Sequence, residues 1–273
     1  MPDLYLRIAD QPEDVLSAIA EAMNTRAADP QMRAICASYP EKLPRPGATV
    51  VEIGCGNGAS SARIIETLAP DTFTGIDPSP GLLELARTRF AGHDGVRFAP
   101  GEAVATGLAG ASVDIVVAHT VFSHLADPAA ALAEAFRVLR PGGMLAVFDG
   151  DYATTTVALG EDDPMEAAMV MARRNLVHDP YVMRRLPALL RTTGFDLTGT
   201  GAHGYVQTDR PDYMRTLIDR GLAAASRAGA VGDGFVQGIS SEADRRIADG
   251  TFYGAILFVS LVARKPRSAR PAA

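Results

Sequence analysis

A glycine-rich segment between Val51 and Gly58 contains residues whose types and spacing suit ligand binding. It reads Val-Glu-Ile-Gly-Cys-Gly-Asn-Gly, which predicts the end of a strand, a tight turn and the start of a helix. Gly54 lets the chain turn, Gly56 lets the backbone approach a ligand, and Gly58 removes a side chain from that path. Such a turn presents backbone N–H groups at a helix N-terminus and so favours a nucleotide-like ligand.

The glycine spacing by itself fits two classes of protein. Gly54 and Gly56, together with Ala59, also satisfy the relaxed G-x-G-x-x-G/A fingerprint of dinucleotide-binding proteins. Glu52, two residues before the first glycine, helps to separate the two classes. Its carboxylate would repel a pyrophosphate, whereas it would favour an ammonium group on the ligand.

Two further acids follow the next predicted strands. Asp77 lies 25 residues after Glu52, at the end of the second strand, where a carboxylate can accept hydrogen bonds from both hydroxyls of a ribose. NAD would use this acid equally well. After the third strand, Glu102 and the backbone amide of Ala103 can face the edge of an adenine ring.

The elements that position these residues alternate between short β-branched runs and longer helical patterns in the first half of the chain. This alternation is typical of a parallel sheet with crossover helices. A continuous apolar run at 113–118 indicates a central strand buried on both faces. The predicted strands are 48–53, 72–76, 95–99, 113–118, 144–148 and 253–262. The predicted helices are 12–37, 59–68, 81–90, 128–139, 181–193, 212–228 and about 235–248.

Three segments together resemble the class I S-adenosylmethionine-dependent methyltransferase family, and the UbiE/COQ5-like small-molecule branch is the nearest. They are residues 51–58, Gly75-Ile76-Asp77-Pro78-Ser79 and Arg137-Val138-Leu139-Arg140-Pro141-Gly142-Gly143. The resemblance covers roughly residues 45–150, with a weaker echo through Thr200. It implies a Rossmann-like α/β fold, a mostly parallel seven-stranded sheet with flanking helices and a helical lid. It also implies S-adenosylmethionine as the cofactor and S-adenosylhomocysteine as the product.

The resemblance divides the chain into four parts. Residues 1–44 would form an N-terminal helical lid segment, and residues 45–150 the S-adenosylmethionine-binding core. Residues 151–181 would be a lid or insert, and 182–273 the C-terminal part of the fold with a helical insertion at about 211–248. Open α/β sheets bind ligands at the carboxyl edge of their strands, so we expect the extra helices to cover that edge.

At the methionine end of the cofactor, the resemblance implies that Glu52 and the turn around Gly54 hold the amino-acid group. His119, just after the fourth strand, would offer its backbone carbonyl to the ammonium group. Arg26, within Thr25-Arg26-Ala27, resembles an arginine that often reaches the cofactor carboxylate.

At the adenosine end, the resemblance implies that Asp77 binds the ribose and that Pro78 packs on the adenine. Glu102 would accept from the adenine amino group, and the amide of Ala103 would face a ring nitrogen. One segment departs from the family pattern. Residues 105–108 read Ala-Thr-Gly-Leu where such proteins usually carry a Leu-Pro-Phe-like stretch, which puts the detailed geometry near the adenine in doubt.

Candidate catalytic residues lie where the fourth and fifth strands end. Methyl transfer from a sulfonium requires alignment of the reacting atoms, and a base is needed only when the acceptor must lose a proton. We expect His124 and Asp149 in catalytic roles, although a structural role for His124 stays open. We expect no metal, because the fourth strand ends in Ala118-His119 rather than in an acid. The candidate substrate-binding residues are Tyr5, His124, Asp151, Tyr181 and Arg184.

Composition narrows the partners. The formal net charge is −6 and the chain has only two cysteines, so phosphate-backbone binding, a disulfide framework and a metal cluster are not expected. The N-terminus lacks an apolar signal segment, and the longest apolar run, 253–263, is shorter than the ~20 residues of a spanning helix. We therefore expect a cytoplasmic monomer or homodimer that acts on a small molecule, without nucleic acid and without insertion into a membrane.

The expected function is methyl transfer to a small organic acceptor. Oxygen or carbon is the favoured acceptor atom, on a quinone-like or natural-product-like molecule. Two alternatives stay open. One is a nicotinamide-dependent oxidoreductase, and the other is a methyltransferase fold that binds the cofactor without transferring the methyl group, as a cyclase or a binding module.

Overall fold

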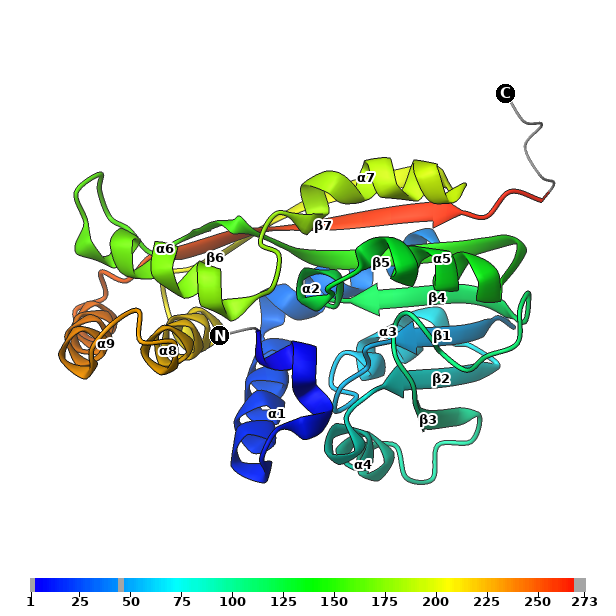
Figure 1. The fold of residues 1–273 in the computed structure, drawn as a ribbon, viewed down its shortest axis with the longest axis horizontal. Helices are drawn as coiled ribbons and strands as arrows, with labels where there is room; N and C mark the ends of the chain where they lie inside the picture. The colour runs from blue at the N-terminus through cyan, green and yellow to red at the C-terminus, as the bar shows by residue number, and fades with distance from the viewer. Residues whose placement is uncertain (1–2, 44–46, 268–273) are drawn as a thin grey trace.

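The computed structural model describes residues 3–43 and 47–267 and shows a seven-stranded sheet in the order β3-β2-β1-β4-β5-β7-β6. The strands are β1 (Thr49–Ile53), β2 (Thr72–Asp77), β3 (Val96–Pro100), β4 (Val113–His119), β5 (Leu139–Thr156), β6 (Asp196–Gln207) and β7 (Gly254–Arg264). The first five are parallel, and β7 runs antiparallel to both of its neighbours (Figure 1). The prediction of a mostly parallel seven-stranded α/β fold is confirmed.

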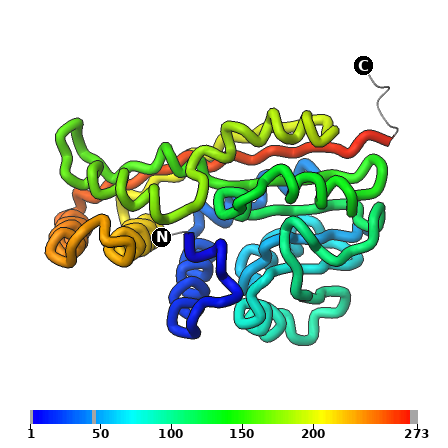
Figure 2. Tube along the Cα trace, in the orientation of Figure 1, coloured from blue at the N-terminus to red at the C-terminus, as the bar shows by residue number. Residues whose placement is uncertain are grey.

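Helices cover both faces of the sheet, as the tube in Figure 2 also shows. One face packs against α5 (Pro128–Val138) and α7 (Val182–Thr193). The other face packs against α2 (Pro30–Ser38), α3 (Ser61–Leu68) and α4 (Pro80–Arg89). Three further helices, α6 (Pro164–Leu176), α8 (Asp212–Arg227) and α9 (Asp233–Ala248), gather at one end of the molecule. We call these three helices the cap.

The alternation of the strands explains why they read as apolar runs. Val50 and Ile115 point into the core on the α3 side, whereas their neighbours Val51 and Val116 point into the core on the α5 side. All four side chains are at most 2% exposed. A parallel strand covered on both faces is apolar at nearly every position, so these sequences favour the centre of the sheet.

The predicted helix 12–37 is two helices. α1 (Glu13–Ala28) ends at Asp29, and α2 begins at Pro30. Proline lacks the N–H that would continue α1, and it is well suited to the first position of a new helix. The Asp29 carboxylate accepts a hydrogen bond from the backbone N–H of Met32 at 2.8 Å and so caps α2. A short 3₁₀ segment, η1 (Leu4–Asp10), precedes α1.

Two methionines after β5 belong to the core. Met165 and Met169 lie on α6, are at most 1% exposed, and pack with residues of α8. The two helices approach closely at Gly221. A Cβ atom at that position would lie 2.4 Å from the Cβ of Ala172. Among the helices of the described residues, none has the length and apolar character needed to cross a bilayer.

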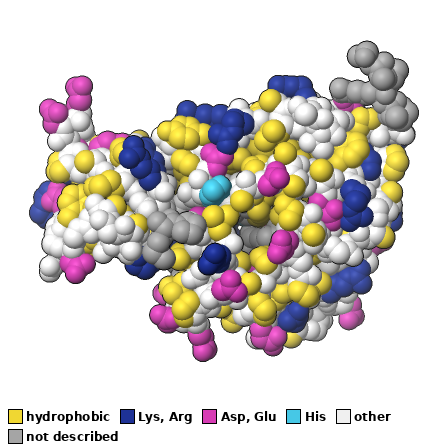
Figure 3. Space-filling view, viewed as in Figure 1, with side chains coloured by type: hydrophobic (Ala, Val, Ile, Leu, Met, Phe, Trp, Pro, Cys, Tyr) yellow, Lys and Arg dark blue, Asp and Glu magenta, His cyan; other side chains and the backbone are white. Residues whose placement is uncertain are grey.

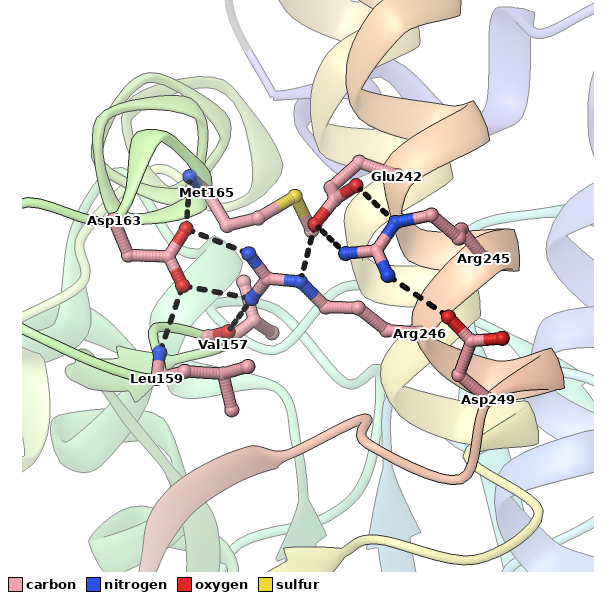
Figure 4. Close-up of polar contacts among 8 residues, drawn as sticks. All are labelled: Val157, Leu159, Asp163, Met165, Glu242, Arg245, Arg246 and Asp249. Carbon is pink, nitrogen blue, oxygen red and sulfur yellow. Dashed lines mark hydrogen bonds and ion pairs between the residues drawn. The ribbon is translucent and has the colours of Figure 1, made fainter.

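A buried ion pair fastens the cap (Figure 4). Asp163 caps α6 by accepting from the backbone N–H groups of Met165 and Leu159, at 2.9 and 2.8 Å. Both of its oxygens also accept from the Arg246 guanidinium of α9, at 2.9 and 2.7 Å. The two side chains are 7% (Arg246) and 6% (Asp163) exposed, and Glu242 takes a further hydrogen bond from Arg246 at 2.7 Å. This bidentate ion pair joins residues 83 positions apart in the sequence.

We expect Arg246→Met to lower the free energy of unfolding by about 3 kcal/mol, because it leaves the Asp163 carboxylate buried without its cation. Arg246 holds the pKa of Asp163 well below its usual range. The stabilisation is therefore present above about pH 4 and is lost as the pH falls through the lowered pKa. Urea denaturation at pH 7 and near pH 2 measures both effects. Arg245→Met, at an exposed ion pair on the same helix, is the control and should change little. Equal losses from the two variants would contradict the buried clamp.

Candidate cofactor and acceptor site

A cavity of about 600 Å³ lies at the carboxyl ends of β1, β2 and β4, between the sheet and the N-terminal segment. It brings together nine of the residues that the sequence singled out: Tyr5, Arg26, Gly54, Asp77, Pro78, Glu102, Ala103, His119 and His124. Seven others do not line it: Glu52, Gly56, Gly58, Asp149, Asp151, Tyr181 and Arg184. Residues of η1, α1 and α2 close the side opposite the sheet.

Glycine is needed at each of these positions of the turn for a different structural reason. Gly54 has φ +69°, and a Cβ atom there would lie 2.5 Å from a methyl group of Val121 on the cavity wall. A Cβ at Gly56 would meet Met23 of α1 at 2.8 Å, and one at Gly58 would meet Phe90 at 3.0 Å. Because Gly58 has no side chain, Phe90 at the end of α4 can pack on the turn. The expectation that it clears a path for the ligand is corrected.

Asp77 is held with both oxygens at the cavity wall. It accepts from the backbone N–H of Gly56 and from that of Ser79, each at 2.9 Å. Burial raises the pKa of Asp77 above its usual value, and the two amide hydrogen bonds oppose that rise. Each carboxylate oxygen can accept a second hydrogen bond, so the side chain retains capacity for two ribose hydroxyls.

Glu52 lies behind the cavity wall rather than on it. Its oxygens accept from the hydroxyls of Ser61 and Ser60, and Ser60 itself lines the cavity. Burial raises the pKa of Glu52 to about 8, with a smaller rise from Asp77 and opposing effects from the serines and Arg26. Glu52 therefore holds a proton at pH 7 and acts on the cavity through Ser60.

His119 stands in a stack of aromatic rings. Its ring lies 4.6 Å from that of Phe148 at an interplanar angle of 17°, and Phe148 stacks in turn on Tyr39. The two ring nitrogens contact the Tyr39 hydroxyl at 2.9 Å and the Cys36 thiol at 3.5 Å. Burial, with a further contribution from Arg26, holds the pKa of His119 well below its usual value. The imidazole is therefore neutral and forms an uncharged part of the wall.

His124 is paired with an acid that the sequence did not indicate. Its Nδ1 lies 2.5 Å from a carboxylate oxygen of Asp3, whose side chain is 1% exposed. Asp3 also accepts from the backbone N–H groups of Tyr5 and His178, at 3.0 and 2.9 Å. The Tyr5 ring packs on His124 with 4.1 Å between centroids. No sequence signal could have found this pair, because 121 positions separate its members.

Asp149 serves the turn that carries His124. It accepts from the backbone N–H and hydroxyl of Ser123, at 2.9 and 3.1 Å, and from the N–H of Gly150 at 2.8 Å. The side chain is fully buried and outside the cavity, and burial raises its pKa. These contacts favour a positioning role over direct contact with an acceptor.

The remaining substrate candidates form a separate group outside the cavity. Asp151 accepts from Arg184 Nε at 2.8 Å, and the Arg184 guanidinium lies 5.1 Å from the centre of the Tyr181 ring. Tyr181 is 50% exposed. The structure therefore places these three residues with one another and does not bring them to the cavity.

The charges near the cofactor turn are consistent with an amino-acid ligand. Arg63 of α3 lines the cavity, and its Nε is buried without a hydrogen-bond partner within residues 3–43 and 47–267. A free guanidinium donor suits a carboxylate. On the face seen in Figure 3, arginine and lysine side chains are interspersed with acidic and apolar ones rather than gathered in one band.

The fold, the turn and the carboxylate at Asp77 define a nucleotide-binding methyltransferase core. Residues 51–147 match the family model described as a methyltransferase domain. The chain is also 31% identical over 212 residues to trans-aconitate 2-methyltransferase of Methylobacterium radiotolerans, covering 72% of this chain and 74% of that protein. The chain belongs to the class I S-adenosylmethionine-dependent methyltransferases. The nicotinamide alternative is thereby excluded.

Three further comparisons show how far the likeness extends. The chain is 30% identical over 180 residues to malonyl-[acyl-carrier protein] O-methyltransferase of Hahella chejuensis, covering 59% of this chain and 63% of that protein. For another curated relative the chain spans only 44% of its length. Among solved structures, the [4+2]-cyclase SpnF superposes with a TM-score of 0.60 at 20% identity, over 98% of this chain and 99% of the other. That likeness concerns the fold alone.

We expect Glu52→Gln to stabilise the ligand-free protein increasingly as the pH rises. The unfolded chain releases this proton near pH 4.5, whereas the folded chain retains it to about pH 8, so wild-type stability falls across that window. Glutamine does not titrate, and Asp77 and Arg26 are common to both proteins. Melting temperatures between pH 5 and 9 measure the difference. Glu84→Gln, at a side chain 74% exposed, should give a difference independent of pH. A flat difference for Glu52→Gln would refute the raised pKa.

Proposed function

We propose that this protein transfers the methyl group of S-adenosylmethionine to an oxygen atom of a small organic acceptor. The observation that carries the proposal is the single cavity that joins the cofactor candidates to His124. Asp77, Pro78, Glu102 and Ala103 line one part of it, and Tyr5, Arg26 and His124 line another. S-adenosylmethionine supplies an electrophilic methyl group on a sulfonium centre when bound.

The residues present fit that cofactor. Asp77 offers carboxylate oxygens for the ribose, Pro78 an apolar surface for the adenine, and Glu102 with the Ala103 amide a polar edge beside it. At the other end Ser60 and Arg63 are available for the amino-acid group. Arg63 shares with Arg26 the candidacy for the cofactor carboxylate, and its unpartnered Nε favours it.

His124 is the candidate base. A carboxylate only accepts hydrogen bonds, so the contact with Asp3 places the hydrogen on Nδ1 and leaves Nε2 of the neutral ring unprotonated. Nε2 can then accept the proton of an acceptor hydroxyl as the oxygen is methylated. Asp3 fixes the tautomer and the ring orientation, while Asp149 holds the turn through Ser123. The Hahella relative is an O-methyltransferase, which supports oxygen as the acceptor atom.

Asp77→Ala is expected to weaken the binding of S-adenosylhomocysteine by about 10- to 100-fold, because two charge-assisted hydrogen bonds to the ribose are lost. Calorimetry gives the dissociation constants. Asp94→Asn, at an exposed acid before β3, is the control and should bind as the wild type does. A wild-type protein that binds neither S-adenosylmethionine nor S-adenosylhomocysteine would rule out the proposed function.

His124→Gln is expected to reduce kcat by about 10²- to 10⁴-fold with an acceptor that supports turnover, since general-base catalysis is removed. Asp3→Asn should reduce kcat by a smaller factor and leave the affinity for S-adenosylhomocysteine unchanged. Release of S-adenosylhomocysteine in single turnovers measures the rate. His93→Gln changes an exposed histidine and serves as the control. If both His124→Gln and Asp3→Asn keep the wild-type rate, His124 is not a general base. Alignment of the acceptor with the methyl group would then be the protein's contribution to the rate.

A further inference from the structure

Two arginines, Arg26 and Arg220, lie near three tyrosines, Tyr5, Tyr152 and Tyr213, beside the cavity. Arg220 of α8 donates to the Tyr5 hydroxyl, Arg26 of α1 lies against Tyr213, and both arginines are half-buried. Within the described part of the chain, neither guanidinium has an acidic side chain within ion-pair distance. Buried positive charge is usually paired, so this arrangement requires an explanation.

Arg220 acts on the cavity through Tyr5. Its Nη2 donates to the Tyr5 hydroxyl oxygen at 3.2 Å, and its guanidinium lies 5.5 Å from the centre of the same ring. Arg220 does not line the cavity, but Tyr5 does. Because the phenol oxygen accepts from Arg220, the phenol hydrogen is free to be donated elsewhere, and the nearby cation makes it a better donor.

Arg26 stands on the cavity wall itself. It lies against Tyr213, a phenol that is 2% exposed, and its charge also reaches His119. His119 is neutral, and burial raises the pKa of Tyr213, so that phenol is neutral as well. None of these neighbours compensates the guanidinium charge.

The two cations also oppose each other. Burial and the charge of Arg26 both act to lower the pKa of Arg220, whereas the three tyrosines raise it. Phenols are uncharged at pH 7, so at that pH burial and like-charge repulsion remain and only neutral oxygens accept from the guanidinium groups. A negatively charged ligand group between Arg26 and Tyr5 would compensate the buried positive charge and reduce the repulsion between the two guanidinium groups.

We propose that Arg26 and the Tyr5 hydroxyl bind a carboxylate of the methyl acceptor, with Arg220 as the positioning residue behind Tyr5. The inference rests on the proposed function and deepens it by naming the acceptor as an acid. A planar guanidinium and a phenol O–H can donate to the two oxygens of one carboxylate. The Tyr5 and His124 rings are 4.1 Å apart, so the acid group binds next to the oxygen that is methylated.

The cofactor carboxylate does not need Arg26 in this arrangement. Arg63 lies on α3, directly after the glycine turn, and its Nη1 pairs with Glu66 at 2.6 Å, but its Nε is buried on the cavity wall and unpartnered within the described residues. Arg63 therefore serves the amino-acid end of the cofactor, and Arg26 serves the acceptor. In the complex of protein, cofactor and acceptor, the cofactor carboxylate and the acceptor carboxylate are then bound by different arginines.

The test uses the full-length protein saturated with S-adenosylhomocysteine, whose binding is first measured by calorimetry. Benzoate, 4-hydroxybenzoate and succinate are titrated beside methyl benzoate, methyl 4-hydroxybenzoate and dimethyl succinate, and melting temperatures are recorded. We expect at least one acid to stabilise the complex and its ester to bind about tenfold more weakly or not at all. Arg220→Met should weaken that acid about tenfold without changing the affinity for S-adenosylhomocysteine. Arg227→Met, at an exposed arginine of the same helix, should not.

A double-mutant cycle tests whether Arg220 acts through Tyr5. Tyr5→Phe should weaken the acid by a similar factor, and adding Arg220→Met to it should cause little further loss. Independent, multiplying losses would overturn the positioning role. The acceptor proposal is overturned if none of the acids stabilises the complex, if the esters bind as well as the acids, or if Arg220→Met retains wild-type affinity. Failure of S-adenosylhomocysteine to bind would instead overturn the proposed function.

Discussion

The hydrogen bonds of Asn57 join the two halves of the site. Its side-chain amide donates to the carbonyl of Ala20 and to the side-chain oxygen of Asn24, at 3.1 and 3.0 Å, while its own oxygen accepts from the Ala59 N–H. Asn57 lies within the glycine turn and is 1% exposed, so α1 is anchored directly on the turn for which cofactor binding is proposed. The N-terminal segment that carries Asp3, Tyr5 and Arg26 is thereby joined to the turn.

This arrangement separates two kinds of charge along one cavity. The acids Asp77, at the end of β2, and Glu102, just after β3, stand at one end, where the adenosine is proposed to bind. The arginines Arg26 and Arg63 stand at the methionine and acceptor end, on helices. In the proposed complex of S-adenosylmethionine with an acidic substrate, the ribose hydroxyls need carboxylates that accept their hydrogen bonds. The carboxylates of the cofactor and of the substrate need cations, so acids and arginines must lie at different places along the cavity.

The sequence predicted the parts of the site that depend on neighbouring residues. The strand, the glycine turn and Asp77 are local patterns, and the parallel sheet follows from apolar runs such as 113–118. The structure brings Asp77 and Glu102 to one cavity because parallel strands end at the same edge. The role given to Gly58 was wrong, because only the packing of Phe90 shows what fills that space.

Other features have no local signal. β6 was not located, because Gly199, Gly201 and Gly204 reduce its β propensity and its pairing with β7 alone defines it. The Asp3–His124 contact joins positions 121 apart, and the Arg220–Tyr5 contact joins positions 215 apart. Such pairs follow from how α1 and α8 dock, which is a property of the packed molecule and not of any segment.

The close approach of α6 and α8 at Gly221 bears on acceptor choice. Gly221 is the next residue after Arg220, and there is no room at this position for even a methyl group beside Ala172. The contact between α6 and α8 therefore fixes the position from which the Arg220 guanidinium reaches Tyr5. A larger residue on either helix would shift the arginine without touching any atom of the cofactor site. Under the proposed role of Arg220, acceptor preference can thus diverge through the spacing of two helices in the cap, while the cofactor turn stays constant.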